Sequence, residues 1–263
     1  MARALAVLLW LITLGGIALF SGRHGWFPET ISEHGPAIDA QFMRTLVVVA
    51  IAFVASQIAL GWYVWRYRED REGDAVYTHG NTKLEVGIML VVAVVFVALA
   101  ALGQKVWAQL HLQDAPADAV QIEVTGQQFV WNIRYPGADG KFGRTDPKLI
   151  NDQENPVGID TKDPAAKDDV VSVNRMAIPV NKSIKVTLRA KDVTHSFFVP
   201  ALRFKQDTTP GLVVPVHFKA LKTGEYEIAC AELCGLGHYK MKGYLMVMED
   251  AQYEAWLKDR ATN

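Results

Sequence analysis

The sequence predicts N-terminal transmembrane α-helices, a two-helix hairpin plus an extra first helix, followed by an all-β sandwich domain. Two observations define this fold class. The first is a set of three uncharged apolar runs within residues 1–110. The second is a change after residue 118, where charged residues appear and short stretches alternate between apolar and polar side chains. A membrane anchor that carries one extramembrane domain accounts for both observations.

The three apolar runs cover residues 4–20, 46–65 and 86–102. At about 1.5 Å per helical residue, runs of this length approach the roughly 30 Å hydrocarbon core of a bilayer. The stretch 91–97 has no polar stripe, which is unusual for a helix buried in a globular domain. We therefore expect a transmembrane helical hairpin within residues 40–110.

Residues 1–22 have two interpretations, a further transmembrane helix or a signal peptide. Their short apolar core behind Arg3 fits both. The segment Phe20-Ser21-Gly22 lacks the small-x-small cleavage pattern in a clean form. We therefore expect a retained helix, with a cleaved signal peptide as the alternative.

Basic residues lie mainly between the second and third runs, and this asymmetry predicts how the hairpin crosses the membrane. By the positive-inside rule the loop 66–84 is cytoplasmic, so the third helix leads outward. The domain after residue 118 then lies on the outer, periplasmic face of a bacterial-type inner (plasma) membrane. The net charge is −1, and no nucleic-acid partner is expected. The basic residues are Arg66, Arg68, Arg71 and Lys83 in the loop, against Arg23 and Arg44 before the second run.

The region 118–250 shows the pattern of an antiparallel β-structure, a sandwich or a barrel. Residues 137–169 break this pattern with Pro, Gly and many charges, so we expect a long surface insertion between strands. A solvated loop is the plain interpretation, and an acidic docking surface for a basic partner is the sharper one. The expected strands are residues 120–125, 128–134, 170–176, 183–189, 196–199, 213–218, 225–230 and 243–248.

Residues 251–263 follow the last expected strand as a C-terminal helix or tail. Within them, residues 251–260 have an amphipathic pattern whose apolar side chains are Tyr253, Trp256 and Leu257. We expect this helix to pack on the β-domain through these three residues.

The segment 230–241 combines two thiols, an imidazole and a thioether, from Cys230, Cys234, His238 and Met241, and the chain has no other cysteine. Such soft donors suit copper in electron transfer, whereas a structural zinc site normally uses four strong ligands and no Met. A disulfide would leave His238 and Met241 unexplained, and zinc with one further His stays open. Covalent haem is not expected, because no Cys-x-x-Cys-His run is present.

These residues resemble, position by position, the signature of subunit II of the haem-copper cytochrome c oxidases, Cys-x-Glu-x-Cys-Gly-x-x-His-x-x-Met. A second block, 192–200, resembles the upstream Asp-Val-x-His-Ser segment of that family and contains His195. The resemblance covers residues 40–250. It implies a cupredoxin-like sandwich for residues 118–250, with a dinuclear copper centre, CuA, built by loops at one end.

The resemblance also implies a role for each ligand: two bridging thiolates, two terminal imidazoles, an axial thioether and a backbone carbonyl. Sharing one electron between two copper ions through soft thiolates spreads the change of charge, so little of the structure must move. The Glu232 carboxylate would also point to a Mg or Mn ion at the border with subunit I, where a hard oxygen ligand suits a hard cation. The implied copper ligands are Cys230 and Cys234, His195 and His238, Met241, and the carbonyl of Glu232.

Two departures from the family pattern affect other functional residues. The segment 126–131 resembles an aromatic motif whose first Trp receives electrons in the family, but Phe129 stands there while Trp131 is retained. Phe129 and Trp131 are therefore both candidates for the point of electron arrival. Glu85 resembles the family's Glu at the mouth of a proton path into subunit I, although residues 87–92 lack the Trp and Pro that follow it in the family. The alternative for Glu85 is a carboxylate at a helix end.

The implied function is that of the electron-accepting subunit of a cytochrome c oxidase. The chain would take electrons from a soluble or membrane-attached cytochrome c and pass them to haem in subunit I, which with the other oxidase subunits reduces O₂ to water. The alternative is a membrane-tethered copper-binding or carrier protein without electron transfer. Five histidines lack a neighbouring ligand at metal spacing and are expected at surfaces or interfaces: His24, His34, His79, His111 and His217.

Overall fold

The computed structural model describes residues 1–22, 27–68, 77 and 79–262. Arg23, His24 and Arg71, considered above, lie outside this part of the chain. The first of two compact units is helical and the second is mainly β. They comprise Met1–Phe27 with Asp39–Val106, and Pro28–Ile38 with Trp107–Asn263, respectively.

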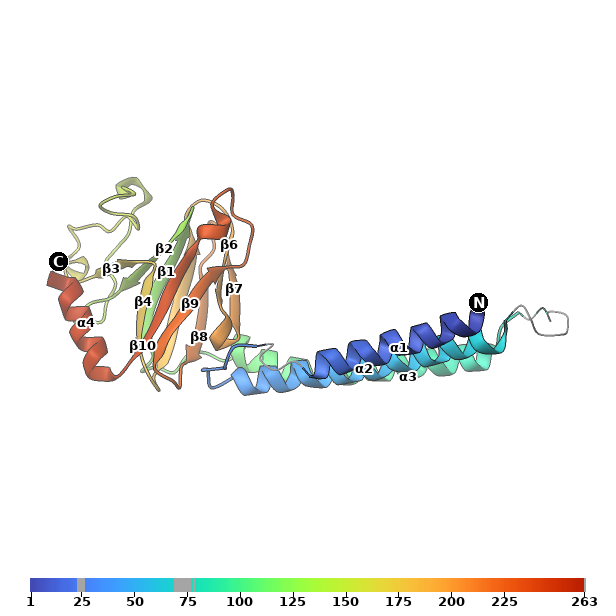
Figure 1. Ribbon diagram of the computed structural model, residues 1–263. Helices are drawn as coiled ribbons and strands as arrows, with labels where there is room; N and C mark the ends of the chain where they lie inside the picture. The colour runs from blue at the N-terminus through green and yellow to red at the C-terminus, as the bar shows by residue number, and fades with distance from the viewer. Residues whose placement is uncertain (23–26, 69–76, 78, 263) are drawn as a thin grey trace. The chain divides into compact units, whose positions relative to one another are not determined.

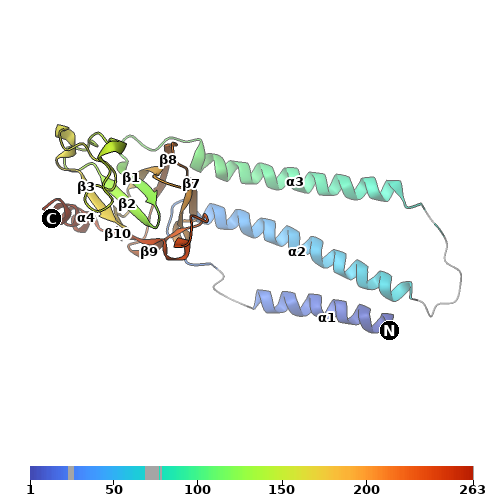
Figure 2. The ribbon, with the colours of Figure 1, turned by 90° about the horizontal axis from the view of Figure 1, so that it is seen from above.

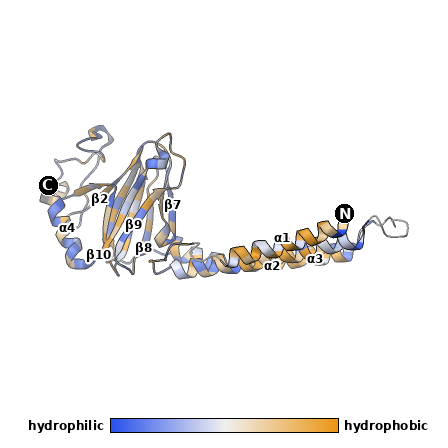
Figure 3. Ribbon diagram, viewed as in Figure 1, coloured by the Kyte–Doolittle hydropathy of each residue, from blue (hydrophilic) through white to orange (hydrophobic). Residues whose placement is uncertain are grey.

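Three long apolar helices precede the β-domain: α1 (Ala2–Ser21), α2 (Gly35–Arg66) and α3 (Thr82–His111) (Figures 1 and 2). Each is long and apolar enough to cross a membrane, which confirms the three predicted helices. Figure 3 shows hydrophobic residues along all three. The helices α2 and α3 are about 48 and 45 Å long, so both exceed the roughly 30 Å hydrocarbon core. Both helices extend beyond the apolar runs 46–65 and 86–102 at their two ends.

Helix α1 packs against α2 through the indole of Trp10, which lies against Gly61 of α2. Trp10 Nε1 donates to the Ile58 carbonyl oxygen at 3.4 Å, and a Cβ added to Gly61 would lie only 2.2 Å from the same nitrogen. The Trp10 ring also stacks on Trp65, with centroids 6.2 Å apart. Small residues let membrane helices approach this closely. Such contacts suit a retained helix, so retention of residues 1–22 stays the prediction.

The β-domain is a sandwich of two five-stranded sheets, which confirms the predicted fold class. The strand orders are β3-β2-β1-β5-β8 and β4-β10-β9-β6-β7. Trp131, Ile178 and Phe197 are fully buried in its core. The strands are β1 (Val120–Gln127), β2 (Val130–Tyr135), β3 (Val170–Val173), β4 (Arg175–Pro179), β5 (Ser183–Ala190), β6 (His195–Val199), β7 (Phe204–Thr208), β8 (Val214–Lys219), β9 (Gly224–Cys230) and β10 (Lys242–Met248).

Three details correct the sequence prediction. The expected strand 170–176 is two strands in different sheets, because Asn174 adopts a left-handed φ of 58° between them. Strand β7 lies outside the predicted set, since it is an edge strand with only its two end residues buried. The pairs β1–β5 and β4–β10 are parallel rather than antiparallel. These partners are distant in the chain, so no hairpin turn sets their direction.

Helix α4 (Asp250–Thr262) closes the chain and packs on the sandwich as predicted. Tyr253 is buried, and Trp256 and Leu257 are partly buried against the core. The Trp256 ring meets the buried Tyr135 edge-on, with centroids 5.4 Å apart. The three residues expected from the amphipathic pattern therefore make the contact.

The predicted insertion connects β2 to β3, and a buried arginine anchors it. Arg134 in β2 pairs with Glu123 at 3.0 Å, with the buried carboxylate of Asp169, and with the Gly143 carbonyl. The Phe142 ring covers the guanidinium, 5.1 Å from its centroid. Because Gly143 and Asp169 lie near opposite ends of the insertion, one side chain ties both ends to the sheet. The insertion contains two short 3₁₀ helices, η1 (Pro147–Leu149) and η2 (Pro164–Ala166).

Candidate metal centre

Two neighbouring strands bring the ligand residues to one end of the sandwich. His195 is the first residue of β6 and Cys230 is the last residue of β9, and these strands pair side by side. The connection from β9 to β10 carries Cys234, the short helix η4 (His238–Lys240) and then Met241. Strand pairing thus joins two chain segments that are distant in the sequence.

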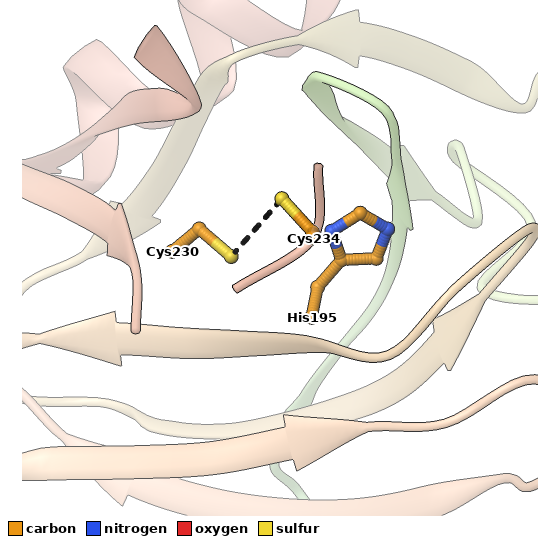
Figure 4. Close-up of side chains that lie close together, drawn as sticks. All are labelled: His195, Cys230 and Cys234. Carbon is orange, nitrogen blue, oxygen red and sulfur yellow. Dashed lines mark hydrogen bonds between the residues drawn. The ribbon is translucent and has the colours of Figure 1, made fainter. Parts of the chain in front are cut away.

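The donor atoms of the β9–β10 connection form one compact group, and Figure 4 shows the two thiols among them. The Sγ atoms of Cys230 and Cys234 are 3.9 Å apart, so both are free thiols rather than a disulfide. Cys234 Sγ lies 3.6 Å from His238 Nδ1 and 3.7 Å from Met241 Sδ. Cys230 Sγ lies 3.2 Å from the Glu232 carbonyl oxygen. The group therefore contains the predicted ligands from this segment.

His195 completes the group and is oriented by Asp192. Its ligand atom and the two cysteine sulfurs all lie within 4.8 Å of one another. His195 Nε2 is 2.8 Å from Asp192 Oδ1, whereas the buried Nδ1 has no hydrogen-bond partner among the described residues. Figure 4 shows one ring nitrogen turned toward the sulfurs. A carboxylate that holds one ring nitrogen leaves the other as a directed lone pair, which is typical of a metal-ligating His.

Hydrogen bonds and charge give the two thiols different acidities. Burial raises the pKa of Cys230, but the adjacent imidazole of His195 and hydrogen bonds to backbone groups outweigh burial and lower that pKa to about 6. Burial and the Cys230 thiolate raise the pKa of Cys234 to about 11. Burial lowers the pKa of His195, yet the negative charge of the Cys230 sulfur and the hydrogen bond to Asp192 bring it above its usual value. A cation bound by both sulfurs would displace any thiol proton that remains.

The donor set fits copper. Two thiols, two imidazoles, a thioether and a backbone carbonyl converge. Nδ1 of His195, which has no hydrogen-bond partner in the described part of the chain, contributes a buried lone pair. Soft donors of this kind favour copper over a hard cation. The thioether of Met241 distinguishes the group from an ordinary structural zinc site.

The two aromatic candidates lie at different depths. Trp131 is fully buried, and its ring meets His195 edge-on with centroids 6.0 Å apart. Phe129 is only partly buried, and its ring packs so closely on Gly237 that a Cβ there would lie 2.3 Å from a ring carbon. Of the two rings, Phe129 is therefore the one at the surface. Glu232 is exposed on the same connection.

Glu85 and the remaining described histidines are not among the donors of this metal group. Glu85 lies in the first turn of α3, just after Asn81, whose side chain accepts from the Leu84 N–H at 3.2 Å. A carboxylate at a helix N-terminus is stabilised by the helix dipole, so the helix end alone accounts for its position. A role in proton uptake stays a prediction. The described histidines outside the metal group are His34, His79, His111 and His217.

Sequence reasoning assigned no role to several residues that build the site. Asp192 was only part of the upstream block, yet its carboxylate orients His195. Gln128 contacts the ligand loop through its side chain, which donates to the Cys234 carbonyl. Gly235 has a φ of 128°, a conformation that L side chains rarely adopt. The two glycines flanking Leu236 were the one sequence signal of this close packing.

Comparisons of the sequence with known proteins point to one family. The family model described as Cytochrome C oxidase subunit II, periplasmic domain, matches residues 120–248. The alternative cytochrome c oxidase subunit 2 of Bradyrhizobium diazoefficiens is 36% identical over 98% of this chain and 92% of its own length. Cytochrome c oxidase subunit 2 of Cereibacter sphaeroides is 31% identical over 81% of this chain and 72% of its own. The crystal structure of the periplasmic domain of subunit II (CoxB) of Bradyrhizobium japonicum has a TM-score of 0.42 and 32% identity, over 57% of this chain and 98% of that one.

The fold and the site define a membrane-anchored protein with a CuA-type β-domain. The chain belongs to the cytochrome c oxidase subunit II family. The resemblance stated from the two sequence blocks is thereby confirmed.

Proposed function

We propose that this chain is the electron-accepting subunit of a cytochrome c oxidase, which takes electrons from cytochrome c and passes them to haem in subunit I for reduction of O₂ to water. The carrying observation is the convergence of soft donors around a buried imidazole nitrogen that has no other described partner. A pair of copper ions held there would supply one-electron chemistry shared through both thiolates. A disulfide would leave the imidazoles and the thioether unused, and a structural zinc site would leave the thioether of Met241 unused.

The chain's own residues hold the ligands in place. Cys230, Cys234, His195 and His238 would hold the copper ions, and the thioether of Met241 would add a weaker donor. His195 is fixed by Asp192 and packed against Trp131, so its ring is held on two sides. A site whose ligands are already oriented needs little reorganisation when its charge changes. The backbone carbonyl of Glu232, whose oxygen is 3.2 Å from Cys230 Sγ, is the remaining proposed ligand.

An apolar surface next to the ligands is the proposed docking place of the donor. Leu233, Leu236 and Tyr239 on the β9–β10 connection are 79%, 97% and 77% exposed, and Phe129 lies against the same connection. Large exposed apolar groups that gather in one place mark interaction sites. We propose that cytochrome c contacts Phe129 at this surface and that Trp131, beneath it, packs the His195 ring.

The test uses the full chain in detergent, loaded with copper. We expect two copper ions per chain, the absorption and EPR signature of a delocalised mixed-valence pair, and rapid reduction by cytochrome c in stopped-flow mixing. Leu236→Ala, at a side chain that is 97% exposed on the proposed docking surface, should retain the spectrum but slow reduction, whereas Leu221→Ala, at an exposed Leu that follows β8, should leave both unchanged. One bound zinc and no mixed-valence spectrum would reject the proposal.

The membrane-tethered copper carrier is the competing function. A carrier would release its copper to an acceptor protein and would not pass electrons to haem. Co-purification with haem-containing subunits, followed by haem reduction after the copper signal bleaches, separates the two functions. Haem that stays oxidised in such a complex would favour the carrier.

Two further roles are proposed for carboxylates of this subunit. On the face proposed to be cytoplasmic, Glu85 would stand at the entrance of a proton path shared with subunit I, and Glu85→Gln should slow O₂ reduction while copper reduction stays fast. On the periplasmic face, Glu232 would offer a carboxylate to Mg or Mn at the border with subunit I. Unchanged turnover of the Glu85 variant across pH would reject the first role. Unchanged Mn content of a Glu232→Gln oxidase would reject the second.

A further inference from the structure

We propose that the β1–β2 turn, Gln128 and Phe129, is a clasp that holds the two ligand-bearing segments together, with Gln128 as a positioning residue for the metal centre. The two segments are 192–195, which carries His195, and 234–238, which carries Cys234 and His238. The inference rests on the proposed function, because its consequences are measured at the copper site.

Gln128 makes hydrogen bonds to both segments. Its backbone N–H donates to Asp192 Oδ2 at 2.8 Å, and the other carboxylate oxygen of Asp192 holds the ring of His195. Its side-chain Nε2 donates to the carbonyl oxygen of Cys234. One residue therefore connects the support of the first imidazole to the backbone of the second bridging cysteine.

Phe129 forms the second arm of the clasp. Its ring fills the space over Gly235 and Gly237, where an added Cβ would lie 3.2 and 2.3 Å from ring carbons. Those two glycines flank Leu236, whose side chain is 97% exposed and cannot support the loop from within. The ring therefore supplies the packing that the loop's own side chains lack.

The clasp comes from the opposite sheet, and this gives it a role that strand pairing cannot fill. Strands β1 and β2 belong to the first sheet, whereas β6 and β9, which carry His195 and Cys230, belong to the second. Within the second sheet the Ala231 N–H donates to the Ser196 carbonyl at 3.1 Å, after which the chain leaves the ladder. Beyond that point Gln128 is the residue that links Cys234 to the support of His195.

The experiment replaces Gln128 by Met in the full, copper-loaded chain. This substitution keeps the length of the side chain and removes its donor. We expect copper to pass to a chelator about three- to tenfold faster, as loss of one hydrogen bond implies. The mixed-valence absorption and EPR spectra should also shift, because Cys234 and His195 no longer hold their relative positions. A generally less stable fold would not move these spectra.

Gln121→Met is the matched control. Gln121 lies near the start of β1, whereas the turn follows the end of β1. The Nε2 of Gln121 likewise donates to a backbone carbonyl, that of Ala119 at 3.1 Å. Copper retention and spectra should be unchanged in this variant. Equal effects of both substitutions, or no effect of Gln128→Met, would overturn the clasp.

A metal-free readout separates the clasp from the proposed function. Hydrogen exchange in the copper-free full chain should accelerate in segment 234–238 in Gln128→Met, whereas segment 192–195 keeps the hydrogen bond from the backbone N–H of residue 128 and should keep its rate. Gly237→Ala, which displaces the Phe129 ring, should accelerate exchange mainly in 234–238. A wild-type chain without a dinuclear copper spectrum would reject the proposed function and leave this test of the clasp intact. Exchange that stays at the wild-type rate in segment 234–238 would reject the clasp alone.

Discussion

The insertion 137–169 and the ligand connection 231–241 are both long links between strands, and both are rich in side chains capable of binding a cation. In the insertion the carboxylates bond to the loop itself. Asp168 Oδ2 accepts from the Ala138 and Asp139 N–H groups at 2.7 and 3.0 Å. In the ligand connection, sulfur and nitrogen donors instead converge on one another.

The difference shows that residue type alone does not make a metal site. The donor atoms must also have lone pairs that hydrogen bonds to the protein do not occupy. Hydrogen bonds from the Arg144 and Ala165 N–H groups lower the pKa of Asp163, and that carboxylate serves to shape a turn. The buried Nδ1 of His195 has no such partner among the described residues. This contrast also changes the docking expectation: the paired carboxylates hold the insertion, so we expect donor binding to depend more on the apolar surface than on acidic framing.

The strongest test of the contrast removes a bridging donor. In Cys230→Ser or Cys234→Ser, we expect complete loss of the dinuclear spectrum, because a hydroxyl does not bridge copper as a thiolate does. Absorption and EPR of the copper-loaded full chain measure this. The matched change in the insertion, Asp168→Ser, should leave the spectrum intact, and a loss of signal there would erase the distinction between the two loops.

The next test removes the anchor of the insertion. In Arg134→Met the buried carboxylate of Asp169 loses its partner, and breaking such a buried pair costs about 3–5 kcal/mol. Thermal unfolding should show a clearly lower Tm. Protein that remains folded should keep the copper spectrum, since the network does not include a ligand. A weakened spectrum at temperatures well below the transition would mean that the insertion also supports the metal centre.

A smaller effect is expected from the axial thioether. Met241→Leu keeps the apolar volume, so both copper ions should stay bound. Loss of a weak electron donor disfavours the oxidised state, and the reduction potential should rise. Redox titration of the absorption bands measures the shift. If copper is lost instead, the thioether is a holding ligand and the site depends on Met241 as much as on the thiols.

The smallest effect concerns pH at the other end of the domain. Burial raises the pKa of Tyr253 to about 12, above its usual value of about 10. The neutral form is therefore favoured by folding, and its contribution is present below pH 10 and lost as pH rises from 10 to 12. In this window the wild-type chain should lose stability more steeply than Tyr253→Phe, as measured by chemical denaturation. Parallel curves for the two proteins would contradict the assigned burial of the phenol.

Local patterns in the sequence were sufficient for the parts of the molecule that depend on short offsets. Apolar runs predicted the three helices, alternation predicted most strands, and the spacing from Cys230 to Met241 predicted a soft-metal site. Each of these is set by the periodicity of a helix or strand, or by neighbours within one loop. His195 came from the resemblance to a family, because no local rule connects it to cysteines that follow it by more than thirty residues.

Only the tertiary structure decided what depends on contacts between sheets. It placed Trp131 beneath the surface and Phe129 on it, although only one residue separates them in the sequence. It also gave Asp192 and Gln128 their partners and divided 170–176 between two sheets at Asn174. Burial and hydrogen bonding are properties of the packed chain, so the same residue types could equally have been solvated. The sequence by itself therefore determined which atoms can bind copper, and the packing of the two sheets decided which residues hold them.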